Sequence, residues 1–260
     1  MQVWNSLPVW IDYRRALEGP ALGGRAIGFV PTMGALHRGH ASLVERCRRE
    51  NEIVVASIFV NPTQFNDPSD LDRYPRTIDS DLLLLDRLGA DHVLAPSATC
   101  LYPHGYHFHV ECDSSYMVME GASRPGFLQG VMTVVLKLLN IVRPHRTYFG
   151  EKDFQQLKVV REMVEDLFLS TEIVPCPTVR EESGLAESSR NALLSPADRT
   201  RAASLFRVLT TAASPSEARA ALESEGFAVD YVEERWGRRF AAASLGRVRL
   251  IDNIPLPDHP

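Results

Sequence analysis

The chain has 260 residues, of which 45% are hydrophobic, and its formal net charge at pH 7 is -5. A chain of this length forms one large domain or two unequal ones, with enough buried surface for a sizeable core. The acidic balance lacks the basic footprint of nucleic-acid-binding proteins, so we expect no nucleic-acid partner. No basic segment followed by an apolar run opens the sequence, and no apolar run reaches the ~18 residues of a membrane span. We therefore expect a cytoplasmic protein with no membrane partner.

The first two thirds of the sequence alternate between strand-like and helix-like patterns. Short apolar runs, several rich in β-branched residues, predict strands over 26–30, 53–60, 92–95, 147–150 and 172–174. Apolar residues at helical spacing predict helices over 40–50, 79–88, 130–141 and 154–167. This alternation is typical of α/β proteins. We predict a Rossmann-like, doubly wound parallel sheet.

The composition changes after about Val179, where Ala and Arg become frequent. The pattern beyond it predicts helices over 196–213 and 216–224 and strands over 229–233 and 246–251. We predict two domains, a Rossmann-like nucleotide-binding and catalytic domain over 1–178 and a small α+β C-terminal lid domain over 179–260.

Cysteine and histidine spacing argues against a protein-bound metal. The four cysteines form no Cys-x-x-Cys pair, so we expect free thiols in a reducing compartment. His107 and His109 would share one face of a strand, but no third ligand stands at a suitable spacing.

The segment Pro31–His40 carries the strongest chemical signal. It follows the first predicted strand, and Gly34 permits a tight turn before His37-Arg-Gly39-His40 opens a helix. A helix N-terminus offers unpaired N–H groups and a positive dipole end to a phosphate, and Gly39 allows close approach. Two imidazoles three residues apart could donate to phosphate oxygens that gain charge during displacement at phosphorus. The segment predicts a nucleotide-phosphate site.

Three further polar segments complete the pattern. Asn61-Pro-Thr-Gln64-Phe65 follows a strand, and its amides suit hydroxyl and carboxylate groups. Gly150-Glu-Lys152-Asp153 follows another strand, where Lys152 can neutralise phosphate and Asp153 can contact the ribose or support the site. Ser188-Ser-Arg-Asn191 offers two hydroxyls and a guanidinium that could clamp a polyphosphate.

Together these segments resemble the pantothenate synthetases, adenylate-forming members of the HxGH nucleotidyltransferase group. The resemblance rests on VPTMGALHRGH, FVNPTQF, DLDRYPRT, YFGEKDFQQL and SSRN, and it resumes at RVRLIDNI over 247–254. It implies an ATP-dependent ligase with two steps. The carboxylate of (R)-pantoate attacks the α-phosphorus of ATP, and the amine of β-alanine then displaces AMP from pantoyl adenylate, giving pantothenate.

The resemblance also implies a role for each matching position. The catalytic positions are His40, His37, Lys152 and Arg190. The ATP positions are Met33, Gly34, His37, Gly39, His40, Gly150, Lys152, Asp153, Val179, Glu187, Ser188, Ser189 and Arg190. Gln64 and Gln156 match the pantoate glutamines, and Gln64 also matches the β-alanine contact. We expect Mg²⁺ to arrive with ATP, with Asp81 as a possible water-mediated partner. The resemblance implies a homodimer and no tightly bound organic cofactor.

Three features depart from the usual family pattern. Phe127 replaces a histidine, Glu187 stands where Leu or Met is usual, and the stretch between Tyr231 and Arg247 is short. They leave open a diverged amide ligase with the same adenylation core but another acid or amine. A weakly catalytic binding or regulatory relative is a third reading, against which the intact His37, His40 and Lys152 argue.

Overall fold

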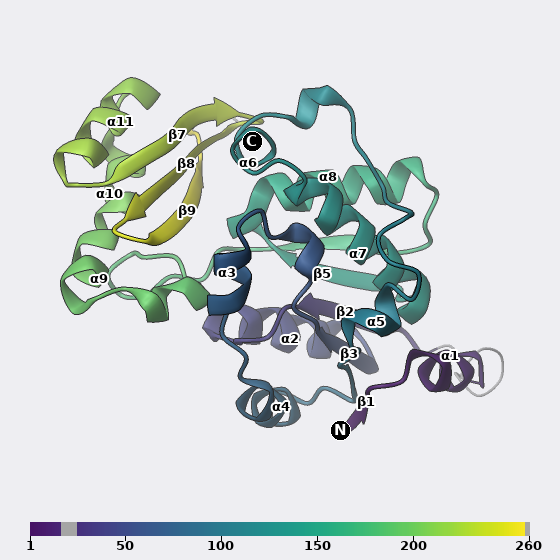
Figure 1. Ribbon diagram of the computed structural model, residues 1–260. Helices are drawn as coiled ribbons and strands as arrows, with labels where there is room; N and C mark the ends of the chain where they lie inside the picture. The colour runs from purple at the N-terminus through teal and green to yellow at the C-terminus, as the bar shows by residue number, and fades with distance from the viewer. Residues whose placement is uncertain (17–24, 258–260) are drawn as a thin grey trace. The chain divides into compact units, whose positions relative to one another are not determined.

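The structure is a computed structural model that describes residues 1–16 and 25–257, and it divides into two compact units (Figure 1). Unit 1 comprises Met1–Gly150 and Gln155–Cys176, and unit 2 comprises Glu151–Phe154 and Pro177–Pro260. The short segment 151–154 therefore groups with the C-terminal part of the chain, although the residues directly before and after it belong to unit 1. No helix in the described ranges is long and apolar enough to cross a membrane.

Unit 1 is built on a six-stranded parallel sheet in the order β1-β4-β3-β2-β5-β6. Its strands are β1 (Gln2–Trp4), β2 (Ile27–Thr32), β3 (Ile53–Ile58), β4 (His92–Leu94), β5 (Arg146–Gly150) and β6 (Glu172–Cys176). Successive connections run outward in one direction from β2 and in the other from β5, so the order reverses between these two neighbours. The predicted doubly wound parallel sheet is confirmed, and β2 and β5 flank its switch point.

Helices cover both faces of this sheet. The helices in this part of the chain are α1 (Leu7–Ala16), α2 (Arg38–Glu50), α3 (Pro68–Arg73), α4 (Ile78–Arg87), α5 (Ala98–Leu101), α6 (Glu120–Ser123), α7 (Phe127–Val142) and α8 (Phe154–Asp166), with 3-10 turns η1 (Pro62–Gln64) and η2 (Ser114–Tyr116). Right-handed crossovers place α2 and α4, which lead toward β4, on one face, and α7 and α8, which lead toward β6, on the other. Leu43 and Val44 of α2 and Leu85 of α4 accordingly share a buried cluster with the central strands.

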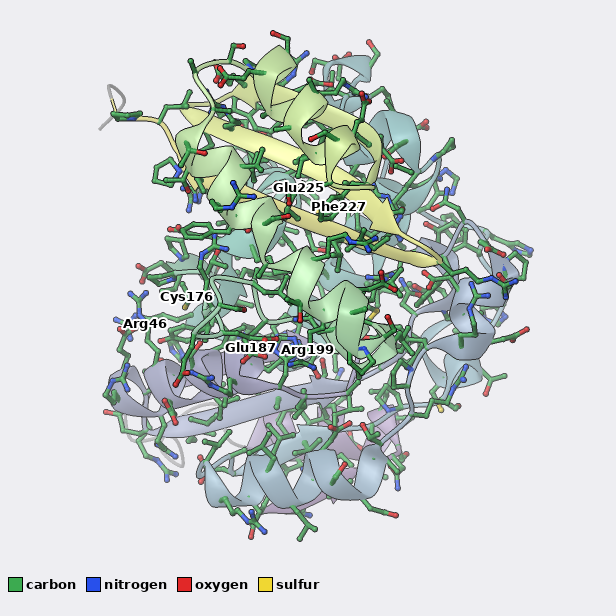
Figure 2. All side chains as sticks on the ribbon, turned by 90° about the vertical axis from the view of Figure 1, so that its left-hand side faces the viewer. Arg46, Cys176, Glu187, Arg199, Glu225 and Phe227 are labelled. Carbon is green, nitrogen blue, oxygen red and sulfur yellow. The ribbon has the colours of Figure 1, made fainter. Side chains whose placement is uncertain are left out.

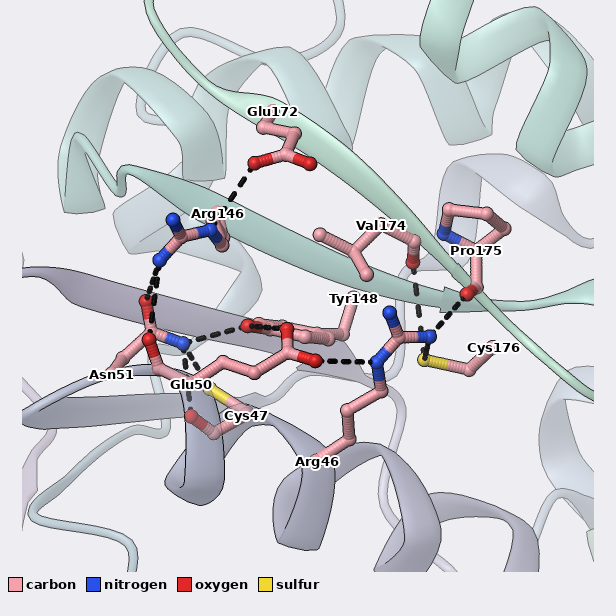
Figure 3. A network of polar contacts seen from close by, with 10 residues as sticks. All are labelled: Arg46, Cys47, Glu50, Asn51, Arg146, Tyr148, Glu172, Val174, Pro175 and Cys176. Atoms are coloured by element: carbon pink, nitrogen blue, oxygen red, sulfur yellow. Dashed lines mark hydrogen bonds and ion pairs between the residues drawn. The ribbon is translucent and has the colours of Figure 1, made fainter.

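Helix α2 is held to the sheet along its C-terminal half (Figure 3). Arg46 donates to the carbonyl oxygen of Pro175 at 2.7 Å and to the carboxylate of Glu50 at 2.9 Å. The hydroxyl of Tyr148 donates to the same carboxylate at 2.8 Å and accepts from Asn51 at 2.7 Å. Donation from Arg46, followed by that from Tyr148, lowers the pKa of Glu50. These bonds fix α2 against β5 and β6, and so fix where its N-terminus points.

Unit 2 is an α+β unit, as predicted. An antiparallel sheet in the order β7-β8-β9 is formed by β7 (Ala228–Arg235), β8 (Arg238–Leu245) and β9 (Val248–Pro255). Its other elements are η3 (Glu151–Asp153), η4 (Ser189–Leu193), α9 (Pro196–Ala202), α10 (Ser204–Thr211) and α11 (Pro215–Ser224). Leu205 and Leu209 of α10 pack with Phe227, which lies beside Glu225 just after α11 (Figure 2).

Several elements differ from the predicted ones. Strands β1 and β8 and helix α1 lie outside the predicted elements. The single helix predicted over 196–213 is two helices, α9 and α10, separated by Ala203. Strand β8 contains Ala241, Ala242 and Ala243, whose intrinsic strand preference is low. All three are completely buried. Strand β8 pairs on both sides, and Ala241 and Ala243 face the cluster that contains α10. Tertiary packing therefore overrides local preference there.

Candidate functional site

The loop after β2 is shaped by a buried carboxylate. Both oxygens of Asp81 accept backbone N–H groups, from Ala35 at 2.9 Å and from Leu36 at 2.9 Å, and Thr77 donates to it at 3.1 Å. Gly34 is in the left-handed region at φ +79, and a Cβ there would lie 3.0 Å from Asp81. Asp81 is 2% exposed. These contacts favour a role in shaping the loop over the magnesium contact that the sequence analysis predicts for Asp81.

The two histidines at the start of α2 use the same ring atom to cap the helix. The N–H of Gly39 donates to Nδ1 of His37 at 3.1 Å, and the N–H of His37 donates to Nδ1 of His40 at 3.4 Å. A neutral imidazole that accepts at Nδ1 carries its hydrogen on Nε2. The ring centroids lie 4.1 Å apart. The cap therefore gives both rings a donor at the far nitrogen, at a helix N-terminus that favours anions.

Gln64 is fixed by its neighbours in η1, the turn that follows β3. Asn61 donates to the amide oxygen of Gln64 at 3.1 Å and to the carbonyl oxygen of Gly130 at 3.1 Å. The amide nitrogen of Gln64 donates to the sulfur of Met33 at 3.1 Å. Gln64 is 8% exposed, and a Cβ on Gly130 would lie 2.5 Å from the carbonyl oxygen of Thr63. Two predicted positions, Met33 and Gln64, are thus in direct contact.

Phe127, which departs from the family pattern, forms a stack with Arg124. The guanidinium carbon of Arg124 lies 3.7 Å from the centre of the Phe127 ring. The same guanidinium donates to the carbonyl oxygen of Gln64 at 3.2 Å and pairs with Glu120 at 3.3 Å. An aromatic face under a cation is attractive without any hydrogen bond. Phe127 therefore supports the Arg124 side chain that contacts the Gln64 backbone.

The neighbouring glutamines of α8 differ in their surroundings. Gln155 is 4% exposed; its amide oxygen accepts from the N–H of Glu120 at 3.0 Å. Its amide nitrogen donates to the carbonyl oxygens of Tyr116 at 3.1 Å and Val118 at 2.9 Å. Gln155 thereby braces the 116–120 segment, whereas Gln156 is half-buried. The predicted pantoate contact is Gln156. Both ends of the Gln155 amide are already engaged by the protein, whereas Gln156 is only half-buried, which is compatible with that prediction.

In unit 2, segment 151–154 carries Lys152 and Asp153. The ammonium of Lys152 lies 3.8 Å from the carboxylate of Asp153, and their side chains are 18% and 46% exposed. The amide of Asn253 donates to the carbonyl oxygens of Glu151 and Lys152, each at 2.9 Å. The predicted phosphate-binding lysine therefore stands on a turn that β9 holds by its backbone.

The remaining ATP positions of unit 2 share one folded loop. The N–H of Glu187 donates to the carbonyl oxygen of Val179 at 2.9 Å, and the hydroxyl of Ser188 accepts the N–H of Arg190 at 3.3 Å. Buried Asn191 donates to the carbonyl oxygen of Ala186 at 3.0 Å and to Glu181 at 3.2 Å. The structure thus brings Val179 next to Glu187 and caps the turn that carries Ser188–Arg190.

Each unit therefore gathers part of the predicted set. The loop after β2 and Gly150 at the end of β5 lie at the carboxyl ends of neighbouring strands, where α/β proteins bind ligands. Arg124, Gln155 and Asn253 have structural roles that were not predicted from the sequence. For Asn253, the match at RVRLIDNI was the one available signal. Within residues 1–16 and 25–257, no group of three or more His, Cys, Asp and Glu side chains could hold a metal ion.

Comparison with known proteins agrees with this arrangement. A family model described as pantoate-beta-alanine ligase matches residues 10–255. A pantothenate synthetase from Bdellovibrio bacteriovorus is 52% identical over 98% of this chain and 99% of its own. A pantoate-beta-alanine ligase from Francisella tularensis, solved in complex with beta-gamma ATP and beta-alanine, superposes with a TM-score of 0.92 at 40% identity, covering 98% of this chain and 97% of that one. A pantothenate synthetase from Thermus thermophilus gives a TM-score of 0.88 at 43% identity over the whole of both chains. This chain belongs to the pantoate-beta-alanine ligase family.

Proposed function

We propose that this protein condenses (R)-pantoate with β-alanine, using ATP and passing through pantoyl adenylate. A pantoate carboxylate oxygen bonds to the α-phosphorus of ATP, and the bond to the bridging oxygen breaks to release pyrophosphate. The nitrogen of β-alanine then bonds to the acyl carbon, the bond to AMP breaks, and the amine loses a proton. Catalysis is positioning and charge stabilisation, because neither step needs a covalent enzyme intermediate.

The observation that carries this proposal is the shared Nδ1 capping of His37 and His40. It leaves the hydrogen of each ring on Nε2, beside a helix N-terminus, and such donors suit the phosphate oxygens that gain charge as pyrophosphate leaves. Gln64 supports the second half of the proposal. Its buried, preset amide can bind the pantoate carboxylate and then β-alanine without titrating.

Unit 2 supplies the other proposed ATP contacts. Lys152 neutralises phosphate charge as a point cation, and the hydroxyls of Ser188 and Ser189 with the guanidinium of Arg190 hold phosphate oxygens. We also propose ATP contacts, as the resemblance implies, for Gly150 of unit 1 and for Asp153, Val179 and Glu187 of unit 2. We propose that unit 2 serves as the lid of the enzyme. The relative that was solved with beta-gamma ATP and beta-alanine supports both molecules as substrates.

Magnesium fits this scheme as part of the substrate. Mg²⁺ usually keeps several waters and binds through substrate phosphates with one or two carboxylates, rather than in an all-protein cage. Asp81 already accepts three hydrogen bonds that shape the loop after β2, so we propose that this structural role, rather than the predicted water-mediated contact with Mg²⁺, is its main one. We propose that the ion enters with ATP and neutralises phosphate charge, while the protein residues orient the reacting groups.

One assay series tests the proposal against the alternative amide ligase. Pyrophosphate exchange into ATP is measured with pantoate and with a panel of other small carboxylic acids, and AMP release is then measured with β-alanine and other amines. We expect exchange with pantoate and pantothenate as the product with β-alanine. Exchange with another acid alone, or adenylate formation without product from β-alanine, would overturn it in favour of a diverged ligase. No exchange with any acid would favour a non-catalytic relative.

Two further expectations stay predictions: the homodimer that the family resemblance implies, and the cytoplasmic location expected from the sequence pattern. Sedimentation equilibrium of the purified chain would measure the first. A single species at the mass of one chain, at micromolar concentration, would contradict it. Fractionation of the source cells would measure the second.

A further inference from the structure

The RVRLIDNI segment has no role in the reaction so far, although it is one of the motifs that carry the resemblance. It forms most of β9, the edge strand of the unit 2 sheet. Two of its polar residues, Asp252 and Asn253, are 3% and 2% exposed. Buried polar side chains are retained where they satisfy specific partners. The partners of Asn253 lie in segment 151–154.

The side chain of Asn253 is fully engaged. Its amide nitrogen donates both hydrogens, to the carbonyl oxygens of Glu151 and Lys152 at 2.9 Å each. Its amide oxygen accepts from Nε of Arg238 at 2.5 Å. Acceptance from a guanidinium fixes which end of the amide is oxygen, since Arg can only donate. The nitrogen must therefore face the two carbonyl groups.

The surroundings of this amide are rigid. The guanidinium of Arg238 lies 4.7 Å above the ring of Phe154 and 3.6 Å from the carboxylate of Glu151. Asp252 pairs with Arg180 through two contacts of 2.6 and 2.9 Å, and it accepts the N–H of Asn253 at 2.8 Å. Asn253 and its neighbour Asp252 are thus both held by specific partners. A side chain held this firmly can set the position of the backbone that it binds.

We infer that Asn253 is a positioning residue for Lys152. By holding the carbonyl groups on both sides of the Lys152 Cα, it sets the direction in which the lysine side chain leaves the turn. This inference rests on the proposed role of Lys152 at the ATP phosphates. Displacing a catalytic or binding group by about 1 Å can cost on the order of 100-fold in rate. Asn253 thus contributes to ATP use through the lysine, and touches no substrate itself.

The decisive variant is Asn253→Asp, which keeps the shape but turns a donor into an acceptor that faces two carbonyl oxygens. We expect the kcat/KM for ATP in pyrophosphate exchange to fall about 10- to 100-fold. The KM for pantoate should change less than threefold. Arg249→Ala is the control and should leave both constants unchanged. Arg249 lies on the same strand as Asn253, and its ion pair is with Asp230 of β7.

A double-mutant cycle separates positioning from general loss of structure. In a Lys152→Ala background, Asn253→Asp should lower the exchange rate by less than twofold further, because there is no lysine left to position. Effects that multiply in the double variant would overturn the inference. If Asn253→Asp does not fold, Asn253→Ser takes its place in the cycle, since it retains one short donor.

Two readouts do not depend on turnover. Hydrogen exchange of the backbone amides over 151–156 should accelerate in the Asn253 variant and stay unchanged in Arg249→Ala. Calorimetric affinity for ATP in the absence of any acid should fall at least fivefold in Asn253→Asp. If neither the hydrogen exchange of 151–156 nor the affinity for ATP changes in Asn253→Asp, the inference is overturned. Because these measurements need no pantoate, they remain decisive even if the wild-type protein forms no pantothenate and the proposed reaction is wrong.

Discussion

Nδ1 of His40 accepts the backbone N–H of His37 at 3.4 Å. His40 in the first turn of α2 therefore holds His37, the residue that precedes this helix. The same bond sets the tautomer that leaves Nε2 as the donor. His40→Ala should therefore lower adenylate formation by about 100-fold or more, the scale for losing one preorganised donor.

The measurement is pyrophosphate exchange with pantoate at saturating ATP. His40→Gln is the informative companion, because the amide nitrogen of Gln can reach the position of Nε2 and should restore part of the rate. A loss below threefold in His40→Ala would show that His40 is misassigned.

Asp81 should contribute strongly to stability, since its buried carboxylate accepts two backbone N–H groups of the loop after β2. Asp81→Asn replaces one acceptor with a donor and should lower the free energy of unfolding by about 2–3 kcal/mol, as hydrogen bonds to a buried charge are strong. The KM for ATP should rise as well, because the loop loses its shape. Asp79→Asn, exposed on the same helix, is the matched control. Urea unfolding measures the stability of both variants, and equal midpoints would contradict this role.

Glu187 places a carboxylate beside Ser188 and Ser189. If its charge opposes the phosphates of ATP, Glu187→Leu and Glu187→Gln should each lower the KM for ATP, by about two- to tenfold. Glu182→Gln removes the same charge from an exposed position of the same loop and should have little effect. Steady-state kinetics with varied ATP decide the point. An unchanged or raised KM in both Glu187 variants would mean that the carboxylate is directed away from the nucleotide.

His92 should make stability depend on pH. Nε1 of Trp4 donates to its Nδ1 at 3.3 Å, and the Tyr13 hydroxyl lies 3.3 Å from its Nε2. Burial lowers the pKa of His92 from its ordinary 6.5, while Asp91 partly opposes the shift. The unfolded chain therefore takes up a proton before the folded protein does. Stability from this site is complete above pH 6.5 and is lost as the pH falls below it.

The experiment compares urea midpoints at about pH 7.5 and about pH 5.5, on either side of the ordinary histidine pKa, for the wild-type protein and His92→Asn. Asn keeps an acceptor for Trp4 but cannot bind a proton. The variant should lose less stability than the wild type between these two pH values. Equal losses would show that groups other than His92 dominate the pH dependence between these two values.

The chemical segments could be located from the sequence because their signals are local. A buried strand such as Ile53–Ile58 is recognised by its β-branched residues, and a glycine-containing turn before a helix indicates a phosphate site. Strand β8 could not be found this way, since three alanines form a strand only when β7 and β9 pair with it and α10 covers it.

The sequence by itself determined the doubly wound sheet, the family and the segments that carry His40, Gln64 and Lys152, because hydrophobic periodicity and short motifs are encoded by neighbouring residues. The tertiary structure alone decided what holds those residues in place. Asp81 is 45 residues from Leu36, and Asn253 is 101 residues from Lys152. Such pairs meet only when the whole chain folds, since a buried donor or acceptor takes its partner from whichever backbone the fold brings beside it.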